Sequence, residues 1–486
     1  MSEYRHDDPL IIWAAPQGSG KGRGSFEEPY TSVTHAIARA LPGNTVVLID
    51  GEYSGDVTIQ NSGSIDRPIR IVAQTKGGAR FSQSCWYLYD VCDLILADIA
   101  FRDSAHGAIS VIGACQRNCF SALAFLRCGT TGDASCTMFF GGSGARCNVV
   151  ENCTFEAPQE NERLDDYDRK SSIGILIAEG DVEQKEMINR NYIVRGNTFS
   201  KYGIGIALGS RETGGRQHGH IIEQNIIRDC FCDGIRAKCG DTTLRANMVL
   251  NCAGCGIALE AGAGSLVNNN RIEQCATGIQ VLGMGHTLRN NCIIGYGQQA
   301  VHIAEKRDEH HISAGNIIAE QNTFSAKNHT ASSVRAAVRV DSAASCILQR
   351  NVFYGKASAY IAAASEAAVP RSRINCFADD NVACGGCESA PGIKELDIAF
   401  DNISADNYEN ATGYGAGGWM ARGQKIEEEA DKSLQTAESA LCENDANNAD
   451  SLIREVDRNE LLSRSLFFNR SDADMQESDI SDVDNE

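Results

Sequence analysis

Asn225-Ile-Ile-Arg-Asp-Cys-Phe-Cys-Asp-Gly-Ile235 is the first of three related stretches that decide the fold of this chain. It is followed by Asn247-Met-Val-Leu-Asn-Cys-Ala-Gly-Cys-Gly-Ile257 and by Asn270-Arg-Ile-Glu-Gln-Cys-Ala-Thr-Gly-Ile279. Each stretch has an Asn, an apolar residue two positions later, a Cys five positions after the Asn, and then a Gly-Ile pair. A repeat of this length, found before any local structure is considered, is typical of a solenoid.

The Asn-x-apolar element extends well beyond these three stretches. It recurs at Asn197, Asn291, Asn322 and Asn351. Apolar and polar residues alternate within each unit, which indicates two or three short strands and no helix. Such a unit cannot bury its own apolar face, so neighbouring units must stack. We therefore predict an all-β fold, a single-stranded right-handed parallel β-helix whose coils repeat at the strand spacing of about 4.8 Å.

Aligning the units at Gly234, Gly256, Gly278 and Ala300 predicts which residues lie one above another. The inward columns are expected to be Ile235, Ile257, Ile279 and Val301, and Ala237, Leu259, Val281 and Ile303. The recurrent Asn residues should bond to neighbouring backbone at the turns. The recurrent residues Cys230, Cys252 and Cys275 should fill an inner corner as free thiols, which favours a reducing compartment.

The two ends of the chain differ from the repeat. Residues 1–43 are predicted to be a lead with a capping helix over residues 31–41, whose apolar residues share one face and which stops at Pro42-Gly43. The β-helix is expected over residues 44–400, with its first strands in 44–53 and 68–73 and its last ordered turns near 376–387. A linker and the end of the solenoid follow over 401–424. An acidic tail over 425–486 is expected to be helical in part and then disordered.

Charge and hydropathy exclude several functions. The chain has 44 Lys and Arg residues against 64 Asp and Glu, a net charge of −20, which argues against nucleic acid as a partner. No run of 18 apolar residues occurs, so no membrane span is expected. The first 24 residues lack the apolar stretch of a signal peptide. We expect a cytoplasmic protein, or a secreted one from which a signal peptide was removed.

Several motifs carry a resemblance to a known group of proteins. Pro29-Tyr-Thr-Ser32, Asp50-Gly-Glu-Tyr-Ser-Gly55 and Pro68-Ile-Arg-Ile71 look like the N-terminal region of polysaccharide lyase-type parallel β-helix proteins. The resemblance covers about residues 11–400. Within that group, the stretch from Ile221 to Gly262 is similar to the chondroitinase B and alginate lyase family. It implies β-elimination of a uronate polysaccharide, in which a Lys removes the C5 proton, Ca²⁺ neutralises the carboxylate and an Arg assists.

The family pattern Glu-x-Glu-x-x-Ser-x-Lys falls on residues 231–238 of this chain. The resemblance thus implies that Lys238 is the base and that Asp233 is a ligand of Ca²⁺. Phe231 stands where the pattern has its other Glu, and the Arg of the next coil falls near Leu259 or Glu260.

The residues themselves also predict a polar face. The two outward columns are expected to be Arg236, Ala258, Gln280 and His302, and Lys238, Glu260, Leu282 and Ala304. Lys238, Arg236 and Glu260 are the candidate catalytic residues: Arg236 would hold a carboxylate and Lys238 or His302 would move a proton. Gln280 and His302 are candidate substrate-binding residues on the same face, within about 15 Å along the solenoid.

The insertion over residues 211–220 precedes this face by one coil. Arg211, Arg216, His218 and His220 are candidate substrate-binding residues if the insertion overhangs Lys238. His218-x-His220 is also a possible metal-binding pair, and an ordinary polar loop is the alternative.

Three functions remain open at this point. The leading hypothesis is a β-eliminating lyase, or a degenerate relative, that acts on an acidic polysaccharide. The second is a non-catalytic glycan-binding or structural β-helix, in which Lys238 and Glu260 form only an ion pair between coils. The third is glycoside hydrolysis by Asp233 and Glu260, whose carboxyl groups would have to face each other about 5 to 9.5 Å apart.

Overall fold

The structure is a computed structural model of the 486-residue chain. It describes residues 4–17, 22–129, 135–142, 144–158, 170–178, 189–209, 218–306, 312–326, 336–341, 345–354, 361–363, 375–379, 381–384 and 393–395. The chain divides into two units, 1–437 and 438–486, and all described residues belong to the first. The predicted linker and acidic tail, Arg211 and Arg216 lie outside the described residues.

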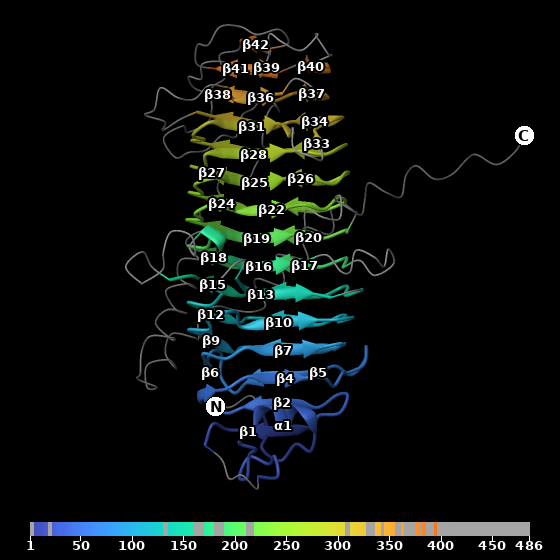
Figure 1. The fold of residues 1–486 in the computed structure, drawn as a ribbon, viewed down its shortest axis with the longest axis vertical. Coiled ribbons are helices and arrows are strands. Elements are labelled where there is room, and N and C mark those ends of the chain that lie inside the picture. The colour runs from blue at the N-terminus through green and yellow to red at the C-terminus, as the bar shows by residue number, and fades with distance from the viewer. Residues whose placement is uncertain are drawn as a thin grey trace, which may run out of the picture. The chain divides into compact units, whose positions relative to one another are not determined.

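Three parallel sheets, here named A, B and C, wind around one core (Figure 1). Each coil adds a short strand to sheet A, the next to sheet B and the third to sheet C, as β20 (Ile221–Glu223), β21 (Ile226–Arg228) and β22 (Ile235–Ala237) do. Each strand pairs in parallel with strands of the coils before and after it. The predicted parallel β-helix is therefore confirmed.

The other strands of sheet A are β1 (Ile11–Ala14), β2 (Thr45–Leu48), β5 (Ile69–Ala73), β8 (Leu94–Ala97), β11 (Cys119–Ser121), β14 (Val149–Glu151), β17 (Ile193–Arg195), β23 (Thr243–Arg245), β26 (Leu266–Asn268), β29 (Thr287–Arg289), β34 (Ile317–Glu320), β37 (Ser345–Gln349) and β40 (Asn375–Asp379). Those of sheet B are β3 (Gly51–Ser54), β6 (Ala79–Ser82), β9 (Ala100–Arg102), β12 (Ala124–Leu126), β15 (Thr154–Glu156), β18 (Thr198–Ser200), β24 (Met248–Leu250), β27 (Arg271–Glu273), β30 (Cys292–Ile294), β35 (Thr323–Ser325), β38 (Val352–Tyr354), β41 (Asn381–Cys384) and β42 (Ile393–Glu395). Those of sheet C are β4 (Val57–Ile59), β7 (Trp86–Tyr89), β10 (Ile109–Ile112), β13 (Cys136–Gly141), β16 (Ile173–Ile177), β19 (Ile204–Leu208), β25 (Cys255–Leu259), β28 (Thr277–Val281), β31 (Gln299–Ile303), β36 (Val338–Val340) and β39 (Ile361–Ala363). The short strands β32 (Glu305–Lys306) and β33 (Ile312–Ser313) pair with each other antiparallel.

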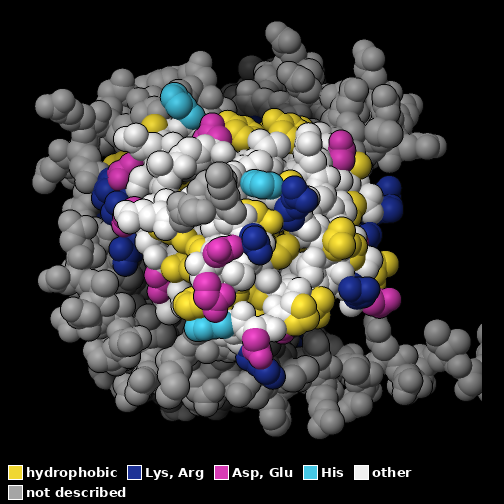
Figure 2. Space-filling view, turned by 90° about the horizontal axis from the view of Figure 1, so that it is seen from below, with side chains coloured by type: hydrophobic (Ala, Val, Ile, Leu, Met, Phe, Trp, Pro, Cys, Tyr) yellow, Lys and Arg dark blue, Asp and Glu magenta, His cyan; other side chains and the backbone are white. Residues whose placement is uncertain are grey.

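The N-terminal end contains one short helix, α1 (Val33–Ala38), inside the segment predicted to be helical. Ser32 is its N-cap and accepts a hydrogen bond from the His35 amide. Val33, Ala36 and Ile37 are buried against the first coil, but Leu41 is 69% exposed, so it does not belong to the apolar face as predicted. Figure 2 views this end, where acidic and basic side chains lie beside one another among hydrophobic ones.

The start of the solenoid differs from the prediction. Sheet A begins with β1, which lies in the lead segment before α1 and pairs with β2. Trp13 on β1 is buried with Val47 and Val72. The β-helix therefore includes residues assigned from the sequence to the lead, because a single short strand leaves no repeat to detect.

The core consists of the predicted inward columns. Ile235, Ile257, Ile279 and Val301 are successive register partners, as are Ala237, Leu259, Val281 and Ile303. All of these side chains are buried. Cys230, Cys252 and Cys275 are free, buried thiols, as expected.

An aromatic stack in sheet B was not predicted. It runs through Tyr53, Phe81, Phe101, Phe125, Phe155 and Phe199, and neighbouring ring centroids are 4.5 to 5.7 Å apart in stacked geometry. Ile227 and Val249 continue the column on the following coils. The early coils are spaced irregularly along the sequence, so their rings do not stand out as a repeat.

The recurrent Asn residues form a continuous buried ladder. In each step the Asn side-chain oxygen accepts bonds from the backbone and side-chain N–H groups of the Asn one coil earlier, at 2.9 to 3.1 Å. Its own side-chain amide donates to a carbonyl, as Asn247 does to Ile222 at 2.8 Å. The ladder thus pairs backbone groups that the sharp turn between sheets A and B would otherwise leave buried and unpaired.

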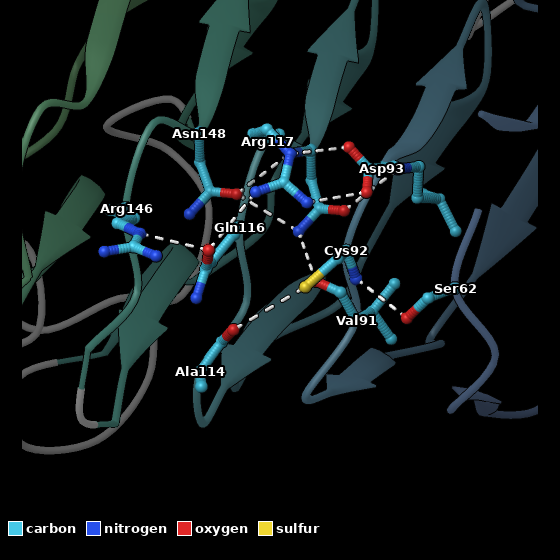
Figure 3. Close-up of polar contacts among 11 residues, drawn as sticks. Ser62, Val91, Cys92, Asp93, Ala114, Gln116, Arg117, Arg146 and Asn148 are labelled. Carbon is cyan, nitrogen blue, oxygen red and sulfur yellow. Dashed lines mark hydrogen bonds and ion pairs between the residues drawn. The ribbon is translucent and has the colours of Figure 1, made fainter. Parts of the chain in front are cut away.

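A similar arrangement precedes sheet A in the early coils (Figure 3). The Asn148 side-chain oxygen accepts from the Asn118 side chain at 3.1 Å, and Asn118 donates to the Val91 carbonyl at 2.8 Å. On the outside of the same turns, Arg117 forms two bonds of 2.7 Å to Asp93. This edge is therefore held by polar contacts between successive coils.

We expect Asn247→Ala to lower the free energy of unfolding by about 2 to 4 kcal/mol. The substitution leaves the buried Asn225 amide without its partner and removes one hydrogen bond to the Ile222 carbonyl. An unpaired buried group costs roughly 1 to 3 kcal/mol and a lost hydrogen bond about 1 kcal/mol. Urea unfolding followed by circular dichroism measures the change. Asn251→Gly is the control, because Asn251 is exposed with a φ of +55° that glycine tolerates. Equal losses in the two variants would contradict a special role for the ladder.

In the described part of the chain, no helix has both the length and the apolar character needed to cross a membrane.

Candidate functional site

The outer face of sheet C carries the predicted polar column. Arg236, Ala258, Gln280 and His302 are successive register partners on β22, β25, β28 and β31. Arg339 on β36 follows His302 and extends the column by one coil. Because the side-chain period of a strand is two, Lys238 and Glu260 lie on the same outer side as Arg236. The sequence prediction of a shared face is therefore correct.

Four charged residues near β22 form the Arg236 cluster, which consists of Asp233, Arg236, Lys238 and Glu260. Arg236 Nε and Nη2 lie 2.8 and 2.6 Å from Asp233 Oδ2. The same Nε lies 3.4 Å from Glu260 Oε1, and Lys238 Nζ lies 3.8 Å from Glu260 Oε2. The ion pair between Lys238 and Glu260, which the sequence left as an alternative, is present.

Asp233 anchors this cluster to the next coil. It is buried, and its Oδ1 accepts the Cys255 amide at 2.7 Å. Burial lowers the pKa of Arg236, but the charge and hydrogen bond of Asp233 outweigh that effect and raise the pKa above its ordinary value. The guanidinium is thus a fixed positive charge, three-quarters buried on the face of the sheet.

The described residues do not fit the calcium ion that the resemblance implied. Both oxygens of Asp233 are engaged, one by the Cys255 amide and the other by Arg236. Ca²⁺ takes six to eight oxygen ligands, and the described residues contain no group of three or more His, Cys, Asp or Glu that could hold a metal ion. The cations beside these carboxylates are the Arg236 guanidinium, which contacts both Asp233 and Glu260, and the Lys238 ammonium beside Glu260.

The contacts of Asp233 and Glu260 with Arg236 also test the hypothesis of glycoside hydrolysis. That function needs two carboxyl groups that face each other across a substrate. Asp233 and Glu260 both approach the Nε atom of Arg236, so a guanidinium lies between them. This arrangement does not support the third hypothesis.

A second group of charges, the His302 cluster, lies higher on the same face and consists of His302, Arg339 and Asp341. His302 Nε2 lies 3.1 Å from Asp341 Oδ2, and Arg339 Nε donates to Asp341 Oδ1 at 3.1 Å. The Glu305 amide also donates to Asp341, at 3.0 Å. Arg339 and Asp341 were not predicted, because the long insertion after residue 304 moves them out of the regular spacing of the repeat.

Asp341 is held in its charged form. Burial alone raises the pKa of Asp341, but the hydrogen bonds from His302 and from the Glu305 amide outweigh burial and lower the pKa to about 2. A carboxyl group whose pKa is lower in the folded than in the unfolded state stabilises the fold at pH values above its unfolded-state pKa. This stabilisation is lost as the pH falls through the pKa of the folded state.

We therefore expect Asp341→Asn to reduce the melting temperature at about pH 6 and to have a smaller effect at about pH 2.5. The reason is that the wild-type carboxylate stops stabilising the fold as it is protonated between about pH 4 and pH 2. Differential scanning calorimetry of both proteins at the two pH values measures this. A difference in melting temperature that does not change with pH would show that the charge of Asp341 is not what matters.

Between the two clusters, the described residues of the two outward columns are uncharged. Gln280 accepts a hydrogen bond from the Cys255 thiol at 3.3 Å, and Ala258 is buried beneath it. In the second outward column, Leu282 and Ala304 are also buried. Gln280 thus belongs to the same face as Arg236 and His302, and it is the polar residue between them.

His218 and His220 do not lie on this face. They precede β20 of sheet A, are both at most 3% exposed, and their rings stack at 5.4 Å. His220 Nδ1 accepts the Tyr192 amide at 3.3 Å, as His286 Nδ1 accepts the Ser265 amide three coils later. Burial holds the pKa of His220 well below its usual value. These histidines therefore pair buried backbone groups, and the expected overhang above Lys238 is not found for them.

The fold defines the class of the protein. A family model described as a right handed beta helix region matches residues 186–325. With the three parallel sheets, this makes the chain a right-handed parallel β-helix protein. Among curated proteins it is similar to the uncharacterized protein YwoF of Bacillus subtilis (strain 168), with 22% identity over 102 residues. That match covers 19% of this chain and 22% of YwoF.

Solved structures give a more particular likeness. The PL6 family alginate lyase AlyGC superposes with a TM-score of 0.60 and 16% identity, over 79% of this chain and 55% of AlyGC. A mannuronic acid specific polysaccharide family 6 lyase from human gut microbiota superposes with a TM-score of 0.56 and 17% identity, over 83% of this chain and 96% of that enzyme. This chain spans about half the length of AlyGC. The expected resemblance to polysaccharide lyases is confirmed at the level of the fold.

Proposed function

We propose that this protein acts on an acidic polysaccharide along the outer face of sheet C, by β-elimination with Lys238 as the base. The observation that carries the proposal is the meeting of Arg236, Lys238 and Glu260 on one outer face of this β-helix. It is supported by the fold, which is shared with enzymes described as alginate lyase and mannuronic acid specific lyase.

Arg236 is suited to bind the carboxylate of a uronate. Its guanidinium is planar and permanently charged, and it can present two parallel N–H groups to a carboxylate. Of its two partners, Asp233 is bonded at 2.6 and 2.8 Å and Glu260 is more distant at 3.4 Å. An incoming substrate carboxylate therefore competes with Glu260, while Asp233 keeps the guanidinium in place.

Lys238 Nζ lies 3.8 Å from Glu260 Oε2, and proton removal requires the neutral amine of this lysine. In the reaction, Lys238 takes the proton from C5, the electron pair forms the C4–C5 double bond, and the glycosidic oxygen at C4 leaves with its bond electrons and takes up a proton from water. Binding of the carboxylate by Arg236 stabilises the charge that develops beside C5.

The direct test is incubation of the full chain with alginate, pectate and chondroitin sulfate, each with Ca²⁺ and with a chelator. We expect the ultraviolet absorbance of an unsaturated uronate to rise with one of these substrates. The chelator should leave the rate unchanged, because Arg236 is the cation at this site. Absence of product with all three substrates would refute the proposal.

A non-catalytic glycan-binding protein is the second candidate. It is favoured by the pairing of charges within the Arg236 cluster, where two cations face two carboxylates, and by Phe231 in place of an acidic residue of the family pattern. Binding on a glycan array that persists in Lys238→Ala, without any unsaturated product from the wild type, would decide in its favour.

A further inference from the structure

The outer face of sheet C continues from Arg236 toward the N-terminal coils (Figure 1). Its outward residues on successive strands form one column of register partners, which are Tyr87, Ser110, Phe139, Leu176, Ala207 and Arg236. Phe139 is three coils from Arg236 and Tyr87 is five coils from it, or about 14 and 24 Å at the strand spacing. A linear polymer that contacts Arg236 and extends along the solenoid axis in this direction therefore passes both rings.

The part of this face next to Arg236 is apolar. Phe139 is partly buried and packs in an apolar cluster with Leu176, Ala207 and Cys232. Cys232 directly precedes Asp233 of the Arg236 cluster in the sequence. Contacts between apolar side chains therefore connect Phe139 with the charged residues of the candidate site.

The Phe139 ring is held on the outer surface of the sheet. It lies over Gly141, two positions further along β13, and a Cβ atom at residue 141 would collide with the ring. The glycine thus leaves the space that the ring occupies. The ring covers the sheet where another residue would have a side chain, and it remains partly exposed.

Two tyrosines extend the aromatic surface on β7. The rings of Tyr87 and Tyr89 have centroids 6.3 Å apart and planes within 10° of each other. Tyr89 is 37% exposed, although it is a large and mostly apolar side chain. A hydrogen bond with the Cys85 thiol raises the pKa of Tyr87 to about 12, so that the Tyr87 phenol is neutral at physiological pH.

Charged groups lie beside these rings and not among them. Asp56 Oδ1 accepts the Cys85 amide at 2.8 Å, and Asp90 Oδ1 accepts the Ala114 amide at 2.8 Å. Asp56 precedes β4 and Asp90 follows β7, so neither belongs to the outward columns. A sugar ring fits this surface better than a carboxylate does, because the negative face of an aromatic ring attracts the C–H groups on the face of a pyranose.

We propose that the aromatic strip, which consists of Tyr87, Tyr89 and Phe139, binds pyranose rings of the same acidic polysaccharide whose carboxylate Arg236 holds. The sugar rings stack on the aromatic side chains, and their carboxylates point away from the sheet. This inference rests on the proposed function, since it gives the direction in which the polymer extends from the Arg236 cluster.

The spacing adds a requirement on length. A dimer of uronate that is held by Arg236 is too short to reach Phe139 across three coils, whereas a hexamer reaches the strip. The strip should therefore contribute to the binding of long oligomers and not to that of short ones.

The experiment is isothermal titration calorimetry with a dimer and a hexamer of uronate prepared from alginate. It uses Lys238→Arg, which keeps the positive charge but cannot remove the C5 proton. We expect the hexamer to bind more tightly than the dimer. Adding Phe139→Ala or Tyr89→Ala should weaken hexamer binding roughly three- to tenfold and leave dimer binding unchanged. Tyr89→Phe should retain the affinity of the parent variant, because it keeps the ring.

Ile347→Ala is the matched control, because Ile347 is an apolar side chain with 39% exposure on the outer face of sheet A. Circular dichroism establishes that each variant is folded. Hexamer binding that is unchanged in both Phe139→Ala and Tyr89→Ala overturns the inference even if the wild type eliminates alginate. The same conclusion follows if Ile347→Ala weakens hexamer binding as much as they do.

The other outcomes separate the inference from the proposed function. Hexamer binding that depends on Phe139 and Tyr89, without elimination by the wild type, supports the aromatic strip and rejects catalysis. Absence of hexamer binding overturns both. Sedimentation velocity tests a second copy of the chain as the occupant. Self-association that is lost in Tyr89→Ala, with hexamer affinity unchanged, would assign the strip to that copy and overturn the inference.

Discussion

Replacing Lys238 with alanine is expected to lower the rate of β-elimination by at least about a hundredfold, because the substitution removes the only proposed base. The rate is measured as the increase in ultraviolet absorbance of the unsaturated uronate product. Lys238 Nζ lies 3.8 Å from Glu260, so a loss of activity could also follow from a disturbed ion pair.

Lys238→Arg separates these two explanations. Arginine keeps the positive charge and can pair with Glu260, but it does not give up its proton and cannot act as a base. We expect this variant to be as inactive as Lys238→Ala. Lys76→Ala is the control for the loss of a lysine, since Lys76 is exposed in a turn before β6. Full turnover in either Lys238 variant would exclude Lys238 as the base.

Phe155→Ala is expected to produce the largest loss of stability, about 3 to 5 kcal/mol in the free energy of unfolding. The Phe155 ring is completely buried between Phe125 and Phe199, at centroid distances of 4.7 and 4.5 Å. Its removal leaves a cavity that the rigid coils above and below cannot close. Since each coil contacts only its neighbours, the loss weakens the interfaces of sheet B on both sides of Phe155.

Denaturant unfolding followed by circular dichroism measures this effect. The control is Phe139→Ala, which removes the same ring from the outer face of sheet C, where Phe139 is only partly buried. We expect a clearly smaller loss for Phe139. If both substitutions lower the free energy of unfolding equally, the aromatic stack contributes no more than a surface aromatic residue does.

The regular coils could be predicted in detail from the sequence. The spacing of Asn225, Asn247 and Asn270 set the register, and the period of two then placed Arg236 and Lys238 outward and Ile235 and Ala237 inward. These predictions succeeded because residues one repeat apart in the sequence stack on adjacent coils of a solenoid. Wherever the coil length is constant, the sequence spacing therefore predicts which residues are neighbours in space.

Where the coil length changes, the same reasoning failed. Arg339 and Asp341 follow an insertion, so nothing in their spacing connected them with His302. His218 and His220 also follow an insertion, and their alternation was compatible with an exposed loop. The structure places them inside, where His220 accepts the Tyr192 amide and His218 pairs with the Asn189 carbonyl.

The sequence by itself thus determined the parallel β-helix, its inward columns and the face that carries Arg236, Lys238, Glu260, Gln280 and His302. Only the tertiary structure decided how those charges pair. Whether two side chains on different coils come within hydrogen-bonding distance depends on their rotamers and their burial, and the repeat pattern specifies neither. It placed Arg236 between two carboxylates, where the family pattern had suggested a calcium ion, and it brought Asp341 to His302. The physical reason is that the backbone repeat is set by local hydrogen bonding and apolar periodicity, whereas the chemistry of the face depends on contacts between side chains that are distant in sequence.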